Sequence, residues 1–180
     1  MDRPSAYALV CEYTHSESLR RHMLAVESAM RAYGRKFGED EEKWGIVGLL
    51  HDFDYERWPN PPDHPLQGAA ILTEKGYPAD VIYAIKSHVD LTPLPNVDVT
   101  LRVTNPLAER EEYNCPRVSL MDKALFACDE LAGFCIAVAK IRPEGIRGME
   151  AKSVRKKLKQ ASFAAAVSRD DIARGGRPGR

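Results

Sequence analysis

The chain lacks the long apolar runs that a membrane-spanning segment needs. No stretch approaches the roughly 18 consecutive apolar residues of a transmembrane helix. Residues 1–4 also lack the basic-then-apolar pattern of a secretory signal. We therefore expect a cytoplasmic protein with no membrane partner.

Cysteine pairs and net charge are lacking as well. The four cysteines show no Cys-x-x-Cys spacing, so we expect reduced thiols in the core. The formal net charge is zero, which argues against a broad surface for nucleic acid. The basic run at 155–159 is typical of a solvated helix face, although it could instead attract an anionic substrate or RNA. No glycine-rich phosphate loop or purine-reading motif is present, so the sequence leaves the substrate's identity open.

The length and composition fit one domain. A chain of 180 residues with 44% hydrophobic content can bury one sizeable core. We predict a single all-α domain, a helical bundle, over residues 1–174. Its core should lie at 19–139 and its C-terminal helices at 149–174, followed by a disordered tail at 175–180. The oligomeric state stays open.

Helical periodicity dominates the first half of the chain. Apolar residues recur at alternating intervals of four and three from Leu19 to Phe37, as one buried helix face requires. Thr14 with Glu17 fits a capping box for that helix. Asp40 can cap the next helix, whose two glycines would allow close packing.

The second half adds more helices and one interruption. Asp63 can cap a helix that runs to Gly76, Pro78 opens another, and Ser119 begins a long one. Residues 90–116 hold four prolines and alternate apolar with polar residues like a short strand. We expect this segment to be a long irregular surface excursion, or a hairpin over the functional site.

The pair His51-Asp52 is the most informative feature, because adjacent imidazole and carboxylate groups at a helix end can bind a metal ion. Further candidate ligands lie within or at the edge of predicted helices: His22, His64, His88 and Asp129. A lone buried histidine is more often an ordinary core residue, but the joint placement of these side chains favours a metal site. Four histidines and two aspartates suit one or two divalent ions of Fe, Mn, Co or Ni better than Zn, with Mg as a further candidate.

The six ligands can be divided between two metals. One ion could be held by a first set: His22, His51, Asp52 and Asp129. A second could lie against His64 and His88, with Asp52 as a catalytic bridge, at the separation of roughly 3.5–4 Å typical of two-metal hydrolases. Water activated there would attack phosphorus without a protein nucleophile.

Other charged side chains near the ligands could take part. Asp54 and Glu56 could orient water or protonate the leaving oxygen, or be ordinary loop charges. Three cations could clamp the phosphate of a substrate, although each is more often a surface charge. These candidates are Arg57, Lys86 and Lys123.

Several motifs carry a resemblance to a known family. They are His22, His51-Asp52, His64-Pro65-Leu66-Gln67-Gly68-Ala69, His88 and Cys128-Asp129-Glu130. Over roughly residues 19–139 the chain resembles the HD superfamily of metal-dependent phosphohydrolases. The stretches LLHDFDYE and ALFACDEL are most similar to those of small bacterial stand-alone HD proteins regarded as hydrolases. Phe53-Asp54 replaces the Ile-Gly that follows the HD pair in many relatives, including the cyclic-dinucleotide enzymes.

The resemblance implies an all-helical fold and hydrolysis of a phosphate ester, often in a nucleotide. It implies that the core metal ligands are His22, His51, Asp52 and Asp129. It also implies that His64 and His88 are the additional ligands found in dinuclear members. We therefore expect a metal-dependent phosphohydrolase that cleaves a phosphate ester or phosphoanhydride of a nucleotide-like small molecule. Two alternatives stay open: a dinuclear-iron oxygenase on the same scaffold, and a non-catalytic signalling or binding module.

Overall fold

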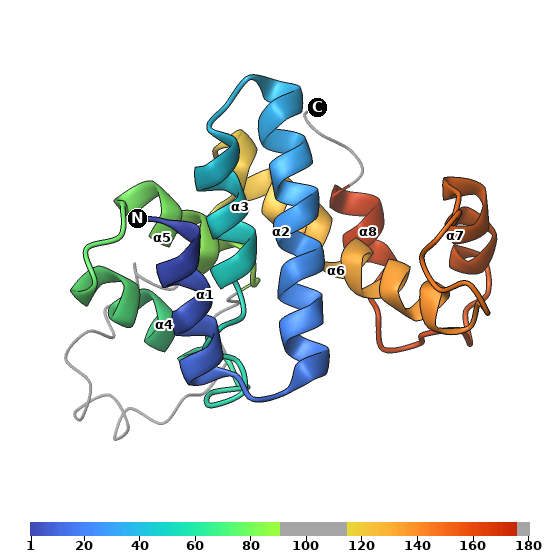
Figure 1. The fold of residues 1–180 in the computed structure, drawn as a ribbon, viewed down its shortest axis with the longest axis horizontal. Helices are drawn as coiled ribbons and strands as arrows, with labels where there is room; N and C mark the ends of the chain where they lie inside the picture. The colour runs from blue at the N-terminus through green and yellow to red at the C-terminus, as the bar shows by residue number, and fades with distance from the viewer. Residues whose placement is uncertain (91–114, 176–180) are drawn as a thin grey trace.

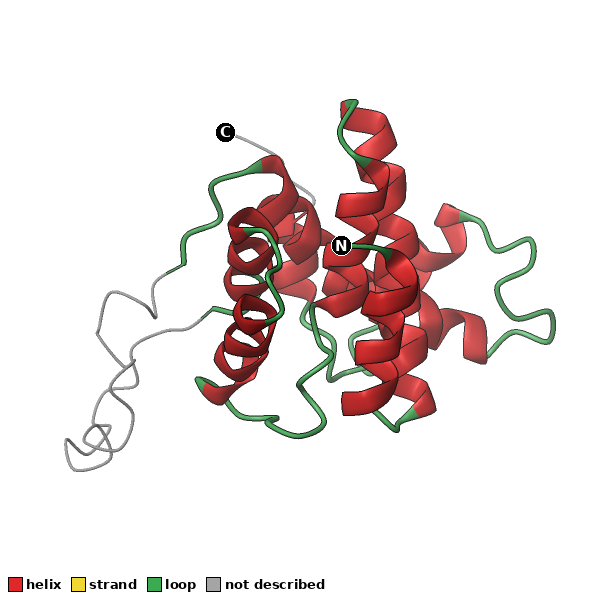
Figure 2. Cartoon of the chain, turned by 60° about the vertical axis from the view of Figure 1, so that its left-hand side comes forward, coloured by secondary structure: helices red, strands yellow, loops and turns green. Residues whose placement is uncertain are grey.

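The computed structural model describes residues 1–90 and 115–175, and every regular element in these ranges is a helix (Figures 1 and 2). The helices are α1 (Arg3–Tyr13), α2 (Glu17–Phe37), α3 (Glu41–Leu50), α4 (Asp63–Glu74), α5 (Ala79–Ser87), α6 (Leu120–Lys140), α7 (Ala151–Leu158) and α8 (Arg169–Gly175). The all-α prediction is confirmed there. None of these helices combines the length and apolar character needed to cross a membrane. The predicted excursion at 90–116 lies almost entirely outside the described residues, as does the tail beyond Gly175, which itself ends α8.

Helix α3 forms the centre of the larger core. All seven residues from Trp44 to Leu50 are buried, so this helix is apolar on every side and must be covered on every side. It lies against α1, α2, α5 and α6, and Figure 1 shows it between α1 and α2. Asp40 caps it as predicted, accepting hydrogen bonds from the backbone N–H groups of Glu42 and Lys43 at 2.9 and 3.0 Å.

Two glycines allow α3 to approach α2 closely, as predicted. A Cβ atom added at Gly48 would lie 2.9 Å from backbone atoms of Val26 and Glu27. One added at Gly45 would lie 2.6 Å from the Nε of Arg31. The close contact between the two helices therefore requires residues without a side chain at positions 45 and 48.

The start of α2 differs from the prediction. Its cap is Ser16, whose hydroxyl accepts a hydrogen bond from Leu19 N at 3.3 Å. Thr14 instead ends α1, and its buried hydroxyl donates to the Phe53 carbonyl at 2.9 Å. The capping-box spacing pointed to Thr14 because α1 itself was not predicted.

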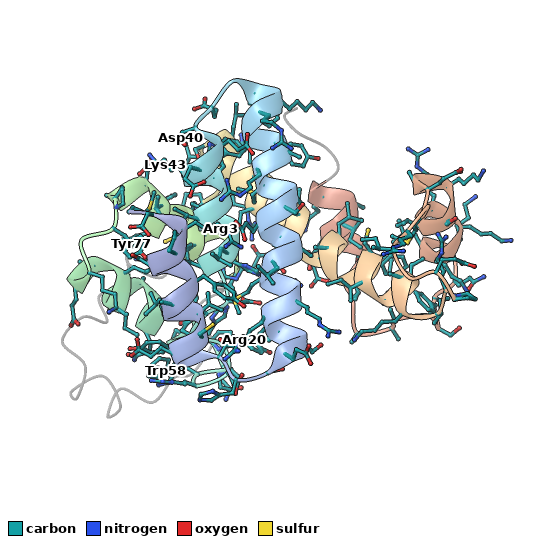
Figure 3. All side chains as sticks on the ribbon, in the orientation of Figure 1. Arg3, Arg20, Asp40, Lys43, Trp58 and Tyr77 are labelled. Atoms are coloured by element: carbon teal, nitrogen blue, oxygen red, sulfur yellow. The ribbon has the colours of Figure 1, made fainter. Side chains whose placement is uncertain are left out.

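Helix α1 packs against α3 and is joined to α2 by an ion pair. Arg3 points from α1 toward α2 (Figure 3) and donates two hydrogen bonds to the buried Glu27 carboxylate, at 2.7 and 2.9 Å. Arg31 donates to the same carboxylate at 3.0 Å. Burying Glu27 is possible because two guanidinium groups offset its charge.

Helix α4 begins with a kink at a residue of functional interest. His64 has an extended backbone (φ −82°, ψ 128°), and no side chain caps the helix at Pro62. Asp63 is therefore not the cap that its position suggested. Downstream, α5 follows Pro78 as predicted, and Ser119 caps α6 through a full capping box with Asp122.

The C-terminal helices surround a second, smaller apolar cluster. Its buried members are Phe134, Val138 and Val154. Helix α6 links it to the main core, because α6 contributes residues to both. Figure 1 shows α7 toward the C-terminal end of α6. Ser168 accepts a hydrogen bond from Asp171 N at the start of α8.

Candidate metal centre

Five helices and the turn after α3 bring the six predicted ligands together. His22 lies on α2, His51 ends α3, Asp52 follows it, His64 lies at the kink of α4, His88 ends α5 and Asp129 lies on α6. Two ligand groups result, each with one nitrogen or oxygen atom per residue and all of these atoms within 4.8 Å of one another.

The first group contains His22, His51, Asp52 and Asp129. His22 Nε2 lies 2.9 Å from Asp129 Oδ1 and 3.1 Å from His51 Nε2. His51 Nε2 lies 3.2 Å from Asp52 Oδ2. The structure therefore brings together the first predicted ligand set.

The second group contains Asp52, His64 and His88. Asp52 Oδ1 lies 3.3 Å from His64 Nε2 and 3.4 Å from His88 Nε2. The two carboxylate oxygens of Asp52 thus face different groups: Oδ2 faces the first and Oδ1 the second. This is the arrangement that a bridging carboxylate requires.

The hydrogen bonds behind the imidazoles determine which ring nitrogen faces the centre. His51 Nδ1 lies 2.8 Å from the Gly48 carbonyl, and His88 Nδ1 lies 2.5 Å from the Ile85 carbonyl. Because a carbonyl can only accept, each Nδ1 carries the hydrogen, and Nε2 of the neutral ring presents a lone pair to the centre. This backing is characteristic of metal-ligating histidines.

The facing nitrogens provide a test of whether a cation fits. His64 Nε2 lies 3.3 Å from His88 Nε2, and the corresponding pair in the first group, His22 and His51, is 3.1 Å apart. Two neutral Nε2 lone pairs at that distance repel each other unless a positive charge lies between or beside them. Four imidazole nitrogens and the oxygens of two carboxylates converge in this way, so the donor set fits one or two divalent cations.

The pKa values of the metal-free protein show how strongly the site favours positive charge. Burial disfavours charged His51, but the Asp52 and Asp129 carboxylates outweigh burial and hold the pKa of His51 well above 6.5. Burial also acts against charged His64, yet hydrogen bonds to Asp52 and Asp54 raise its pKa to about 9. In the absence of metal, protons therefore supply part of the positive charge that the carboxylates require.

The carboxyl groups shift in the complementary direction. Burial alone would raise the pKa of Asp52, but the neighbouring imidazoles, His51 first, hold it well below 3.8. The pKa of Asp129 is lowered in the same way, despite its burial, by hydrogen bonds from His22 and His51. Both carboxylates are consequently ionised at neutral pH and able to act as ligands.

Solvent reaches the centre from one side. The side chains of His22, Asp52 and Asp129 are 18%, 14% and 25% exposed, whereas His51, His64 and His88 are almost fully buried. A pocket of about 450 Å³ opens beside His22. A substrate can therefore approach from the side of His22.

Asp54 contacts one ligand residue and one backbone N–H group. Its Oδ1 lies 2.8 Å from His64 Nδ1, and its Oδ2 accepts a hydrogen bond from Gly68 N at 2.8 Å. The side chain is buried, with both oxygens engaged. Asp54 therefore positions His64, and its role in proton transfer stays a prediction. Gly68 is required here, because an added Cβ would lie 2.7 Å from Asp54 Oδ2.

Glu56 and Arg57 also have structural partners. Glu56 Oε2 accepts hydrogen bonds from the backbone N–H groups of His15 and Ser16, just before α2, at 2.9 and 2.8 Å. A role of Glu56 in proton transfer stays a prediction. Arg57 donates to the Glu12 carbonyl at 2.8 Å and lies 3.9 Å from the centre of the Tyr13 ring. It is held against α1, and its role as a phosphate clamp stays a prediction.

Neither of the two lysines predicted to bind phosphate forms an ion pair with a ligand residue. Lys86 is half-buried on α5, and Lys123 is exposed in the first turn of α6. Their contribution to phosphate binding stays a prediction.

One residue that supports the site, Arg117, is not indicated by any sequence pattern. Arg117 donates to the His88 carbonyl at 3.3 Å and to Asp90 at 2.6 Å. Arg174 of α8 donates to the other oxygen of Asp90 at 2.8 Å. No local pattern could have identified these contacts, because they join three segments that are distant in the sequence.

Comparison with known proteins gives one match. A family model described as the HD domain matches residues 19–131, which run from α2 into α6 and contain all six ligand residues. Among curated proteins and solved structures, no match to the chain was found.

Proposed function

The chain belongs to the HD domain family, whose members are mostly metal-dependent hydrolases, and from this premise we propose that it is a metal-dependent phosphohydrolase. Its substrate would be a phosphate ester or phosphoanhydride of a small, nucleotide-like molecule. One observation carries the proposal: the two oxygens of Asp52 face separate ligand groups, each completed by histidines.

The ligand set determines which residues would hold the ions. His22, His51, Asp52 and Asp129 would hold the first, and His64 and His88 would hold the second together with Asp52. Divalent ions bound there would lower the pKa of water and offset negative charge on phosphoryl oxygens. We propose Fe, Mn, Co or Ni, because imidazole and carboxylate together suit these ions.

The charge of the ligand set favours a phosphate substrate. Two carboxylates and four neutral imidazoles supply a formal charge of −2, and the Asp54 carboxylate behind His64 adds one more. This charge is smaller than that of two divalent ions, so the loaded site would stay net positive. A net positive centre on the open side of the molecule attracts anions.

The positioning residues keep the ligands in place during turnover. The Gly48 and Ile85 carbonyls hold the rings of His51 and His88 with Nε2 toward the centre. Asp54 does the same for His64. Because these acceptors are fixed in the fold, the imidazoles need little rearrangement when substrate binds.

Phosphate release by the manganese-loaded protein tests this proposal. We expect hydrolysis of at least one small phosphate ester, and we expect Asp52→Ala to lose metal binding and activity together. Asp170→Ala, at an exposed position on α8, serves as the matched control and should keep both. Full activity in Asp52→Ala would overturn the mechanism. Turnover that requires O2 would favour an iron oxygenase, and a protein that binds no metal would favour a binding module.

A further inference from the structure

A pocket of about 450 Å³ adjoins the metal centre. The described residues that line it are Ser16, Ser18, Leu19, His22, Tyr55, Glu56 and Pro59. Pockets for small organic ligands span about 300–1,000 Å³, so this one can accept a small organic group.

The pocket touches the first ligand group directly and reaches the second through Tyr55. His22 lines it and belongs to the first group. Tyr55 also lines it, and its ring lies edge-on to the ring of His64 in the second group, with centroids 5.1 Å apart. A phosphate at the metal centre would therefore have its organic group directed toward this pocket.

The pocket wall is apolar apart from three hydroxyls, one imidazole and one carboxylate. Leu19, Pro59 and the ring of Tyr55, which is 42% exposed, offer apolar surface. The described lining contains no lysine or arginine. Burial of an uncharged organic group against this surface is favourable.

Glu56 gives the pocket a negative charge where a phosphate could otherwise bind. The N-terminus of a helix attracts anions through its unpaired N–H groups. Just before α2, Glu56 already accepts hydrogen bonds from two backbone N–H groups, those of His15 and of the cap residue Ser16. A second phosphate would meet this carboxylate with no described lining cation to offset it.

We propose that this pocket receives the uncharged, apolar or aromatic organic group of a phosphomonoester, and that Glu56 disfavours substrates with a second anionic group. This inference rests on the proposed function, because it assigns the substrate class of the same centre.

Binding of two phosphonates to the manganese-loaded protein tests the pocket without turnover, because the C–P bond replaces the ester bond. We expect benzylphosphonate to bind at least about tenfold more tightly than ethylphosphonate in calorimetric titrations. Ser18→Trp, at an exposed position of the lining, should fill the pocket and reduce this ratio to about threefold or less. Ser28→Trp, exposed and ten residues further along α2, should keep the wild-type ratio. Equal affinity of the two phosphonates for the wild-type protein would overturn the inference.

The charge of Glu56 is tested with 4-carboxybenzylphosphonate. We expect it to bind at least about fivefold more weakly than benzylphosphonate. Glu56→Gln should reduce this difference, because the amide oxygen can still accept the hydrogen bonds of the α2 N-terminus while the negative charge is gone. An unchanged difference in Glu56→Gln would contradict the role of this carboxylate.

Kinetics with the corresponding esters separates this inference from the proposed function. A preference for benzylphosphonate without hydrolysis of any phosphate ester would support the pocket and reject the phosphohydrolase. Hydrolysis of benzyl and ethyl phosphate with equal kcat/KM, and equal binding of the two phosphonates, would support the phosphohydrolase and reject the pocket.

Discussion

At the residue scale, the orientation of each buried ligand histidine depends on the group behind it. His51 and His88 are oriented by carbonyls three residues earlier, so their positions follow from the ends of their own helices. His64 differs, because its Nδ1 partner is the Asp54 carboxylate from another segment. The second ligand group therefore depends on one additional side chain, that of Asp54.

Asp54→Asn should weaken metal binding at the second ligand group alone. The amide can accept from only one of the two donors, His64 Nδ1 and Gly68 N, so the ring of His64 loses its fixed orientation. Loss of such a partner lowers metal affinity about 10–100-fold. Manganese titration should show one weakened site and one unchanged site. Asp63→Asn, at the exposed neighbour of His64, is the control, and equal weakening of both sites would refute the positioning role.

The protonation of His64 predicts a pH dependence of metal affinity. Its pKa in the metal-free fold is raised from 6.5 to about 9, so its imidazolium stabilises that fold fully below pH 6.5, and the contribution is lost as pH rises through about 9. Metal ligation requires the neutral ring. Metal affinity should therefore increase from pH 6.5 to about 9.

Calorimetric titrations at pH 7 in two buffers with different ionisation enthalpies measure this proton release. We expect His64→Ala to release fewer protons and to lower the occupancy of only one metal. The same proton release in His64→Ala and in the wild-type protein would show that another group titrates.

At the element scale, the approach of α2 and α3 positions three ligands, and it depends on Gly48. Gly48→Ala should destabilise the protein by about 1–3 kcal/mol, because the added Cβ meets backbone atoms that cannot move aside. Gly133→Ala on α6 is the matched control, since its added Cβ has only an ordinary 3.9 Å contact. It should instead gain up to about 1 kcal/mol from helix propensity. Urea unfolding measures both, and a stabilised Gly48→Ala variant would refute the close contact.

The sequence allowed prediction of those elements that carry apolar periodicity, a capping residue, or both. Helices α2, α3 and α6 have one or both signals in clear form, so their existence was predicted. Helix α1 was missed because apolar and polar residues are poorly segregated around it, although Asp2 and Pro4 mark its start. Local spacing also placed the caps at Thr14 and Asp63, whose actual roles depend on neighbouring segments.

The same distinction applies to the centre. The ligands could be predicted because few roles other than metal binding account for several histidines and aspartates placed together in predicted helices. The roles of Asp54, Glu56 and Arg57 could not, because each depends on a contact 10 to 45 residues away. Charged residues near a ligand in the sequence need not face it in space.

At the scale of the whole molecule, the C-terminal part outside the family match is connected to the centre. Arg117 links the end of α5, where His88 lies, to the start of α6, and it stacks 3.7 Å from the centre of the Phe126 ring. Arg174 extends this contact to α8 through Asp90. Helix α8 thus supports the position of His88 from a distance.

Arg117→Ala should destabilise the protein by about 2 kcal/mol, because it removes a stacked guanidinium and two hydrogen bonds. The second metal should also bind more weakly, since the end of α5 loses a partner. Thermal unfolding and manganese titration measure these effects. Arg155→Ala, exposed on α7, should change neither, and a stable Arg117→Ala variant with unaltered metal binding would show that this connection is unimportant.

The most direct measurement is anomalous X-ray diffraction from crystals of the manganese-loaded protein. We predict two peaks about 3.5–4 Å apart, on either side of the Asp52 carboxylate. One should contact the imidazoles of His22 and His51, and the other those of His64 and His88. An absence of any peak within bonding distance of Asp52 would contradict the two-metal centre.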